Sequence, residues 1–480
     1  MERLTGLDAN FLYNETASEH MHTLKVAVLE PPAGGSPPIE ILREHVGRRM
    51  AAWPAFGRRI VRVPLDLHHP LWVDAGPLDL DYHVRRARIP APGTGHEMDA
   101  MVARLAGEPL DRKRPLWQAW LLEGRADGRV AVLVKVHHAV ADGVAATALL
   151  ASILTTDPDA VLPVPGPPPG AEAVPGRARL VSDALVQVVA DLRRLPSVLR
   201  GTRRSMARRR TAVAELADLD GPSPPRPVLD TPSTSLNRAI TARRTVATTS
   251  LPLAPLLEVR RSAGATLNDV FLTIVGGALV DVLAGRGEHP DRSLSAGVPV
   301  SSDPPPVPGR PPRLSGNKVS NLFVSLCTDV DDPVGRLAAV HRSAAAAKQL
   351  HEALGGDLMA TWLEYTPPRP YSWLMRLYSG LSVADLHRAP FNVVVSNVPG
   401  PREPLYVDGA ELVEFFSAGP VLEGIGVNIT AWSYCGHLDV MVTACARALP
   451  RPEMLTAALH RRLDELTAAV SELPLPSADR

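Results

Sequence analysis

The chain has 480 residues, 45% of them hydrophobic, so it is long enough to bury a large core and, by size alone, to form more than one domain. Its 51 basic and 51 acidic side chains give a formal net charge of zero, which argues against a general polyanion binder such as a nucleic-acid-binding protein. The three cysteines, Cys327, Cys435 and Cys445, lack zinc-site spacing and are too few for a disulfide framework, so reduced thiols in a cytosolic setting are expected.

The N-terminus and the longest apolar stretch bear on targeting. Residues 1–3 (MER) lead into a mixed polar segment without an apolar core, so no signal peptide is expected. Residues 270–285 are nearly all apolar but contain Asp281 and two adjacent glycines, and they are fewer than the roughly 20 residues that a membrane span needs. This stretch therefore predicts a buried helix, and no transmembrane helix is expected.

The first domain, expected over residues 1–156, mixes short alternating strands with helices. Valines alternate with Ala131, Leu133 and Lys135 over residues 130–136, which is typical of a strand in a packed sheet, and helical spacing resumes over residues 145–154. Between them stand two histidines, an aspartate and a glycine (residues 137–143, HHAVADG). The histidines are therefore predicted at the carboxyl end of a strand.

A neutral imidazole at that position can take a proton from a hydroxyl group and return it to a leaving group. His138 is the candidate base, with His137 in support. Gly143 permits an unusual backbone angle in the turn, and Asp142 caps the next helix or pairs with a distant arginine, so both are expected to be structural. A histidine at a strand end is also commonly a packed turn residue. Adjacent histidines on a strand point in opposite directions, so no metal site is predicted.

A connecting segment is expected over residues 157–236, because both of its ends are rich in proline. Between these ends, apolar residues recur at helical spacing over residues 180–192, and eight arginines without an intervening acid follow over residues 193–210. A basic segment beside an apolar helical face can lie on an anionic bilayer. The alternative is a solvated crossover helix between two domains.

The second domain is expected over residues 237–472, followed by a flexible tail at 473–480. Residues 266–283 have helical spacing and residues 391–396 (FNVVVS) predict a strand. A proline-dense loop covers residues 303–312, and no internal repeat is evident.

These blocks together resemble the bacterial wax ester synthase/diacylglycerol acyltransferase family, within the coenzyme A-dependent acyltransferase superfamily whose signature is HHxxxDG. The resemblance runs from end to end. Besides HHAVADG, it is carried by residues 4–11 (LTGLDANF), 20–22 (HMH), 79–84 (DLDYHV), 109–112 (PLDR), 115–117 (PLW), 266–270 (TLNDV), 316–317 (GN), 320–321 (SN), 392–401 (NVVVSNVPGP), 424–429 (GIGVNI) and 433–436 (SYCG).

The resemblance implies an α/β (α+β) fold: two chloramphenicol acetyltransferase-like domains with mixed sheets flanked by helices, joined by a helical and proline-rich crossover. It also implies that His138 is the base, reached from opposite faces by acyl-CoA and an acceptor alcohol, with direct transfer and no cofactor beyond acyl-CoA as co-substrate. No Gly-x-Ser-x-Gly elbow is found, so no acyl-enzyme is expected.

The resemblance supplies further candidate residues, each with a structural alternative. Ser396 and Asn397 are oxyanion candidates or ordinary strand-end residues. Asn268 and Asp269 are placed near the active centre by the resemblance, although both are common helix caps. Residues 115–117, Pro115, Leu116 and Trp117, are expected to pack beside the histidine strand, with acyl-channel lining as the minority reading.

Two features leave alternatives open. His137 and Asp142 also have the HxxxxD spacing of the glycerol-phosphate acyltransferase motif, in which His137 would be the base. Asp303 stands where many relatives have an arginine soon after Pro-Val-Ser, and replacing a cation with an acid would alter any phosphate contact or domain-domain ion pair there. No coenzyme role is therefore assigned to residues 299–303.

The expected function is acyl transfer from acyl-CoA to diacylglycerol, with wax ester synthesis from a long-chain fatty alcohol as the alternative. High alanine, arginine and proline usage is typical of a GC-rich bacterial genome, and the resemblance to actinobacterial storage-lipid enzymes points the same way. A condensation domain or a polyketide-linked acyltransferase shares the histidine motif, but residues 7–11 and 396–401 argue against it. A non-catalytic lipid-binding or droplet protein is the rival from another class. The expected location is the cytoplasm, with possible peripheral contact with the inner face of the plasma membrane or with lipid droplets.

Overall fold

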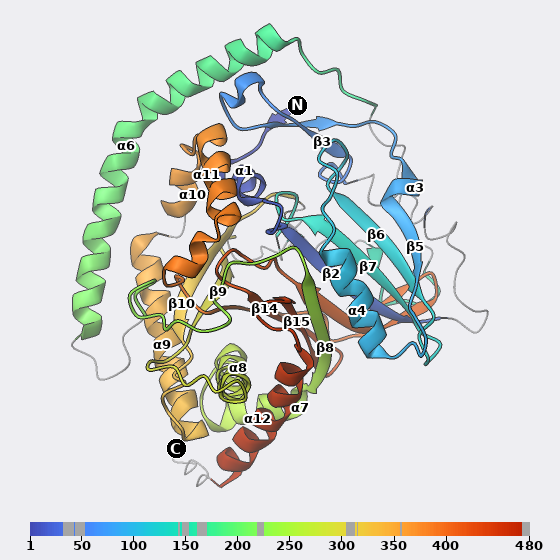
Figure 1. Cartoon of the computed structure of the whole chain (residues 1–480), viewed down its shortest axis with the longest axis vertical. Helices are drawn as coiled ribbons and strands as arrows, with labels where there is room; N and C mark the ends of the chain where they lie inside the picture. The colour runs from blue at the N-terminus through green and yellow to red at the C-terminus, as the bar shows by residue number, and fades with distance from the viewer. Residues whose placement is uncertain are drawn as a thin grey trace.

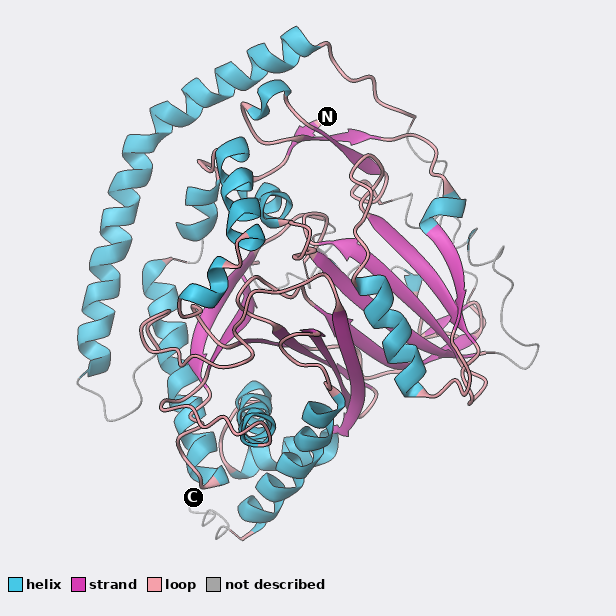
Figure 2. Ribbon diagram, viewed as in Figure 1, coloured by secondary structure: helices cyan, strands magenta, loops and turns pink. Residues whose placement is uncertain are grey.

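The computed structural model describes residues 1–31, 43, 53–142, 145, 153–160, 170–217, 225–303, 313, 315–355 and 358–472. Two mixed sheets of six strands each form its framework, flanked by helices (Figures 1 and 2). This arrangement confirms the fold class expected from the sequence.

The first sheet has the strand order β12-β13-β2-β7-β6-β5. Its strands pair antiparallel except β5 and β6, which are parallel. The strands are β2 (His22–Glu30), β5 (Val84–Arg88), β6 (Trp117–Glu123), β7 (Val130–His137), β12 (Tyr406–Val407) and β13 (Ala410–Ala418). β7 therefore lies in the interior of the sheet, between β2 and β6, as its run of apolar residues predicts.

The second sheet has the order β10-β9-β11-β14-β15-β8 and is also mixed, because β11 pairs parallel with both β9 and β14. Its strands are β8 (Arg244–Pro252), β9 (Ser295–Ser301), β10 (Val319–Ser325), β11 (Val393–Val398), β14 (Val427–Tyr434) and β15 (His437–Cys445). A smaller sheet contains β1 (Glu2–Arg3), β3 (Arg58–Val61) and β4 (Leu71–Asp74) in the order β1-β4-β3.

β12 and β13 come from the C-terminal half of the chain but complete the first sheet, where β13 pairs with β2 along its length. The domain ranges expected from the sequence do not include this exchange. Each six-stranded sheet is the centre of one lobe of the molecule. Apolar packing also crosses the boundary between the two lobes, since Trp432 and Tyr434 of β14 belong to the same buried cluster as Ala139 and Val140. The turn after β7 is thus built into a core that both halves share.

The helices cover the sheets and the seam between them. Helix α4 packs on β8, and α8 packs among α7, α9 and α12 (Figure 1). They are α1 (Gly6–Asn14), α3 (Leu80–His83), α4 (Gly95–Ala106), α6 (Arg177–Ala217), α7 (Leu253–Ser262), α8 (Leu267–Ala284), α9 (Pro333–Leu354), α10 (Leu358–Leu363), α11 (Pro368–Gly380) and α12 (Glu453–Ser471), with 3-10 turns at Pro64–Asp66 and Val383–Leu386.

Two helices bear on the expectations about membrane contact. In the described residues, α8 alone is long and apolar enough to cross a membrane, and 72% of it is buried inside the protein, which confirms the predicted buried helix. The basic segment of the connecting region is one 41-residue helix, α6, which runs along the outside of the molecule and packs on α9 and α10 (Figure 1).

Candidate active site

His138 is the first residue after β7, in the turn that leads toward Asp142. Its backbone N–H donates to the Met21 carbonyl at 2.7 Å, which ties the turn to the segment before β2. Its imidazole lies flat against the Phe11 ring from α1, with 4.1 Å between ring centroids and 16° between planes. The ring is therefore fixed in orientation while part of its surface stays exposed.

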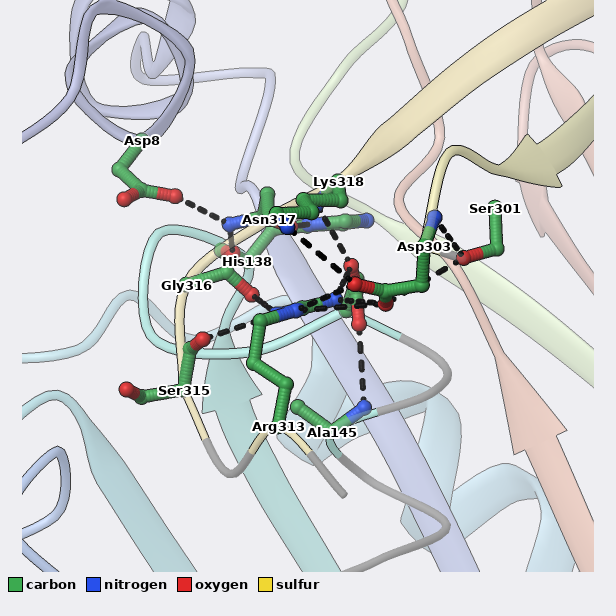
Figure 3. A network of polar contacts seen from close by, with 11 residues as sticks. Asp8, His138, Ala145, Ser301, Asp303, Arg313, Ser315, Gly316, Asn317 and Lys318 are labelled. Atoms are coloured by element: carbon green, nitrogen blue, oxygen red, sulfur yellow. Dashed lines mark hydrogen bonds and ion pairs between the residues drawn. The ribbon is translucent and has the colours of Figure 1, made fainter. Parts of the chain in front are cut away.

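Asn317, which precedes β10 in the second lobe, determines which nitrogen of His138 carries the proton. Its amide Nδ2 donates to the His138 carbonyl and to Asp8 Oδ1, both at 2.7 Å. A carbonyl can only accept, so the amide oxygen must face the ring, where it lies 2.9 Å from Nδ1. His138 Nδ1 is therefore the N–H donor, and Nε2 keeps the lone pair that a base needs (Figure 3).

Asp8 anchors this pair from α1. Asp8 is 4% exposed; its carboxylate accepts from the Asn317 amide, and its backbone N–H donates to the Thr5 hydroxyl at the start of the helix. Burial raises the pKa of Asp8 to about 6, against the lowering effect of these hydrogen bonds. Asp8, Asn317 and His138 thus form a polar chain that crosses the seam between the two lobes.

Burial also lowers the pKa of His138 to about 4, and the hydrogen bond to Asn317 and the nearby Asp142 only partly oppose that shift. The ring is consequently neutral at physiological pH. An imidazole of low pKa is a weak base in the ground state but, once protonated, a strong acid toward a departing group.

Asp142 holds the turn against the second lobe. Its Oδ2 accepts from Arg313 Nη2 at 2.5 Å and from the Lys318 backbone N–H at 2.9 Å, while Oδ1 accepts from the Ala145 N–H at 3.1 Å. It therefore both caps the following segment and pairs with a distant arginine, the two structural roles expected of it. Gly143 lies outside the described residues.

Asp303, which stands where many relatives have an arginine, belongs to the same network. Arg313 donates to Asp303 as well as to Asp142, and it also donates to the carbonyls of Ser315 and Gly316 (Figure 3). Asp303 and Asp142 thus share one guanidinium. The loop after β9 is in this way linked by charge to the histidine turn.

His137 points the other way. Its Nδ1 accepts from the Ala139 N–H at 3.1 Å, so Nε2 carries the proton and faces Glu15 Oε2 at 3.6 Å. Burial pushes the Glu15 pKa upward, but contacts with His137 and Arg112 hold it well below its usual range. His137 is 1% exposed. With its proton directed at a carboxylate, this ring has no lone pair for a substrate hydroxyl.

The other candidates lie at different distances from this centre. Leu116 and Trp117 lie beside the histidine strand: the His137 N–H donates to the Leu116 carbonyl, and Trp117 pairs with Val136. The Trp117 indole donates to the Phe56 carbonyl at 2.9 Å and is fully buried, and Pro115 stands two residues before the first residue of β6.

Asn268 and Asp269 are not brought to His138. Asp269 closes a capping box with Thr266 at the start of α8 and contacts His341 Nδ1 of α9 at 2.8 Å, within the second lobe. The local interpretation as helix caps describes this position.

Ser396 and Asn397 occupy the carboxyl-end half of β11 and are partly exposed. Neither side chain makes a hydrogen bond to a described residue, whereas Val398, which follows them, packs against the shared core that contains Ala139 and Val140. Ser396 shares the face of β11 with Val398 and so lies on the side of that shared core, whereas Asn397 faces the opposite side of the sheet.

The comparisons with known proteins agree with this geometry. Residues 4–271 match the wax ester synthase/diacylglycerol acyltransferase catalytic domain, and residues 315–467 match the C-terminal domain of the same family. The chain belongs to the wax ester synthase/diacylglycerol acyltransferase family. It is therefore an acyltransferase, and its two-lobed architecture is the one that this family uses.

Individual relatives span nearly the whole chain. Two proteins of Mycobacterium tuberculosis (strain ATCC 25618 / H37Rv), provisionally named diacylglycerol O-acyltransferases, are 37% and 36% identical; the alignments cover 98% and 99% of this chain and 96% and 99% of theirs. The wax ester synthase/diacylglycerol acyltransferase from Marinobacter aquaeolei VT8 superposes with a TM-score of 0.65 at 26% identity, covering 98% of this chain and all of that one.

A condensation domain of the calcium-dependent antibiotic synthetase has the same fold, with a TM-score of 0.57 at 16% identity over 99% of this chain and 97% of that chain.

Sequence reasoning missed Asp8 and Asn317 as members of the site. Both stand in blocks that carry the family resemblance, residues 4–11 and 316–317. An aspartate inside an otherwise apolar helix start was the available signal for Asp8.

Proposed function

We propose that the protein transfers a long-chain acyl group from acyl-CoA to diacylglycerol, with His138 as the general base and no acyl-enzyme intermediate. The observation that carries this proposal is the Asn317 contact, which leaves the Nε2 lone pair of a neutral, partly exposed imidazole free. A long-chain fatty alcohol is the alternative acceptor, because the same base serves any primary or secondary hydroxyl group.

A single nitrogen, His138 Nε2, makes both proton transfers of the proposed reaction. Nε2 takes the proton of the acceptor hydroxyl as its oxygen attacks the thioester carbonyl carbon, and the carbonyl electrons move to oxygen. When the tetrahedral intermediate collapses, the C–S bond breaks and the thiolate takes the proton back from Nε2. A His138 pKa of about 4 favours this return.

Asn317 keeps the ring productive through both steps. Its amide oxygen accepts from Nδ1–H, so the ring cannot present the wrong tautomer, and it stabilises the positive charge that develops when Nε2 is protonated. Asp8 fixes Asn317 from the opposite lobe. These two residues position the base.

Either Ser396 or Asn397 is the proposed donor to the oxyanion, because adjacent side chains of a strand face opposite sides of the sheet. Ser396 is the better candidate, since it is partly exposed, makes no hydrogen bond to a described residue, and shares its side of β11 with Val398, which packs against the core containing Ala139 and Val140. A single oxyanion donor contributes typically about 10²–10³ in rate, so positioning of the two substrates must supply the remainder. The direct route fits the cysteines, because burial raises the thiol pKa of Cys327 and of Cys435.

The acceptor is tested with labelled palmitoyl-CoA, offering diacylglycerol and hexadecanol separately to the purified protein. Faster formation of triacylglycerol supports the proposal, and faster formation of wax ester replaces it with the alternative. If neither product forms while the protein still binds lipid, it is a non-catalytic binder and the proposed function is wrong.

The pH dependence of kcat/KM follows from two groups. We expect a plateau above about pH 7, a shallow decline as Asp8 is protonated near its pKa of about 6, and a steep loss as His138 is protonated near its pKa of about 4. In Asp8→Asn the amide oxygen still accepts from Asn317, so the decline near pH 6 should vanish and the one near pH 4 should remain. An acid limb at pH 6.5 in both proteins would show that His138 titrates at its ordinary value.

We also propose that α6 rests on an anionic lipid surface. Its exposed apolar side chains recur every seven residues, and eight arginines accompany them without an acid between residues 192 and 214. These apolar side chains are Leu185, Leu192, Leu199, Met206 and Val213. A second copy of this helix would oppose arginine with arginine, whereas an anionic bilayer offers complementary charge.

Vesicle binding tests this surface. Leu192→Asp/Leu199→Asp should weaken binding to phosphatidylglycerol vesicles at least about tenfold, because two buried contacts with acyl chains are lost and two like charges are added. Leu229→Asp, at a similarly exposed site away from α6, is the control. Equal partitioning of all three proteins, or dimers held by α6 in sedimentation, would exclude lipid as the occupant.

A further inference from the structure

A cavity of about 640 Å³ lies between α4 and β8, on the seam between the lobes and separate from the contacts of His138. Its wall includes four arginines: Arg104 from α4, Arg243 and Arg244 at the start of β8, and Arg451 before α12. Glu108 and Glu453 also line it, as does His96. The lining therefore carries an excess of positive charge in a protein whose net charge is zero.

The acids do not neutralise these arginines. Glu108 Oε1 pairs with Arg104 Nη1 at 2.9 Å. Among the described residues of the lining, Glu453 is then the one remaining acid for the other three guanidinium groups. Arg243 and Arg451 are exposed and form no ion pair with a described residue. Their guanidinium groups are available to an anion from solvent.

Arg244 is the unusual member, because it is 9% exposed and yet bonds only to backbone carbonyls. Its Nη2 donates to the Ser18 carbonyl at 2.6 Å, and Nη1 donates to the Thr241 carbonyl. Glu19 and Glu423 interact with it electrostatically, but burial raises the pKa of both carboxyl groups, that of Glu19 to about 8, so Glu19 is largely neutral at pH 7. A buried cation that forms no ion pair costs free energy that an anionic ligand would offset.

A row of contacting imidazole rings connects the wall of the cavity with the histidine turn. Gly107 lines the cavity, and its carbonyl accepts from His20 Nε2 at 3.1 Å. The His20 and His22 rings stack with 5.5 Å between their centroids. The His22 and His137 rings meet edge to face with 6.4 Å between their centroids, and His137 directly precedes His138 in the chain. Both ring nitrogens of His22, a residue only 4% exposed, lack a protein partner in the described chain.

We infer that this cavity binds the phosphorylated nucleotide end of the acyl-CoA donor. In a coenzyme A thioester the pantetheine arm separates the phosphates from the reacting carbonyl, so a phosphate site must lie away from the base yet connect with it. Arginine forks suit phosphate oxygens because they donate two parallel hydrogen bonds. The inference rests on the proposed function and adds the place where the donor is recognised.

The test compares two donors on three proteins: the wild type, Arg243→Ala/Arg451→Ala, and the control Arg260→Ala, which removes an equally exposed arginine from α7. Palmitoyl-CoA carries the nucleotide, and palmitoyl-pantetheine lacks it. We expect the double variant to raise KM for palmitoyl-CoA about tenfold or more, with kcat unchanged and palmitoyl-pantetheine unaffected. An unchanged KM, or equal losses with both donors, would overturn the inference.

Two further experiments identify the kind of ligand that the cavity binds and distinguish failure of this inference from failure of the proposed function. Adenosine 3′,5′-bisphosphate should compete with palmitoyl-CoA in the wild type but not in the double variant, whereas equal competition by inorganic phosphate would show a simple anion site instead. If the wild type uses neither donor, the proposed function fails. In that case, calorimetric measurement of coenzyme A binding still tests the cavity. Binding that is lost only in the double variant supports the inference, and equal binding by all three proteins refutes it.

Discussion

His138→Ala is expected to lower kcat for acyl transfer by on the order of 10²–10⁴, the usual contribution of a positioned general base. The ring is the only imidazole in the described residues that combines an Nδ1–H fixed by Asn317 with a partly exposed surface. KM for palmitoyl-CoA should change little, because the substituted ring is not part of the arginine-lined cavity. The measurement is steady-state kinetics with labelled palmitoyl-CoA.

Two matched variants make this result specific. His289→Ala removes an exposed histidine that forms no hydrogen bond, ion pair or ring contact with a described residue, so it should leave kcat unchanged. His137→Ala removes a buried ring beside Glu15 and should act mainly on stability, leaving turnover per folded molecule close to that of the wild type. If His137→Ala abolished turnover of folded protein while His138→Ala spared it, His137 would be the base.

Asp142→Ala is expected to cost about 3–5 kcal/mol of unfolding free energy, the typical effect of breaking one side of a buried ion pair. The substitution leaves Arg313 with Asp303 as its remaining acidic partner and removes the acceptor for the backbone N–H groups of Lys318 and Ala145. Denaturant unfolding of the wild type and variant measures this loss.

Asp142→Asn separates charge from hydrogen bonding. The amide oxygen can still accept from one N–H, so this variant should lose less stability than Asp142→Ala and keep measurable activity. Asp183→Ala on α6, where the aspartate is exposed, is the control and should change stability by less than about 1 kcal/mol. Equal stability of the Asp142→Ala variant and the wild type would show that the turn does not depend on this network.

The periodicity of apolar residues predicted those helices and strands that bury one face of a regular pattern. The alternation of valines gave the strand that ends at His137, and the apolar spacing of residues 266–283 gave α8, observed as Leu267–Ala284. The strand expected at 391–396 is observed two residues later, as Val393–Val398. Side-chain periodicity reports burial directly, whereas the ends of elements depend on contacts outside the window.

The partners of the site were less accessible to sequence reasoning, because they are remote in the chain. Asn317 is 179 residues from His138, and Asp8 is 309 residues from Asn317. The expectation that Asp142 pairs with a distant arginine could be stated without naming Arg313, 171 residues away. Nothing in a linear pattern specifies which side chains meet when two sheets close on each other.

The position of Asp269 illustrates the opposite case. A capping box is a local feature, with Thr266 and Asp269 three residues apart, and the local interpretation describes the structure. The expectation of proximity to the active centre came from the family resemblance alone.

The pairing of β13 with β2 has a consequence for how the molecule can be divided. A fragment that stops before residue 406 would leave β2, a largely apolar strand, as an uncovered edge with free backbone donors and acceptors. Such edges recruit strands from other molecules, so separately expressed halves should precipitate unless they are synthesised together. The same pairing ties the C-terminal half of the chain to the first sheet and so limits how far the two lobes can move apart.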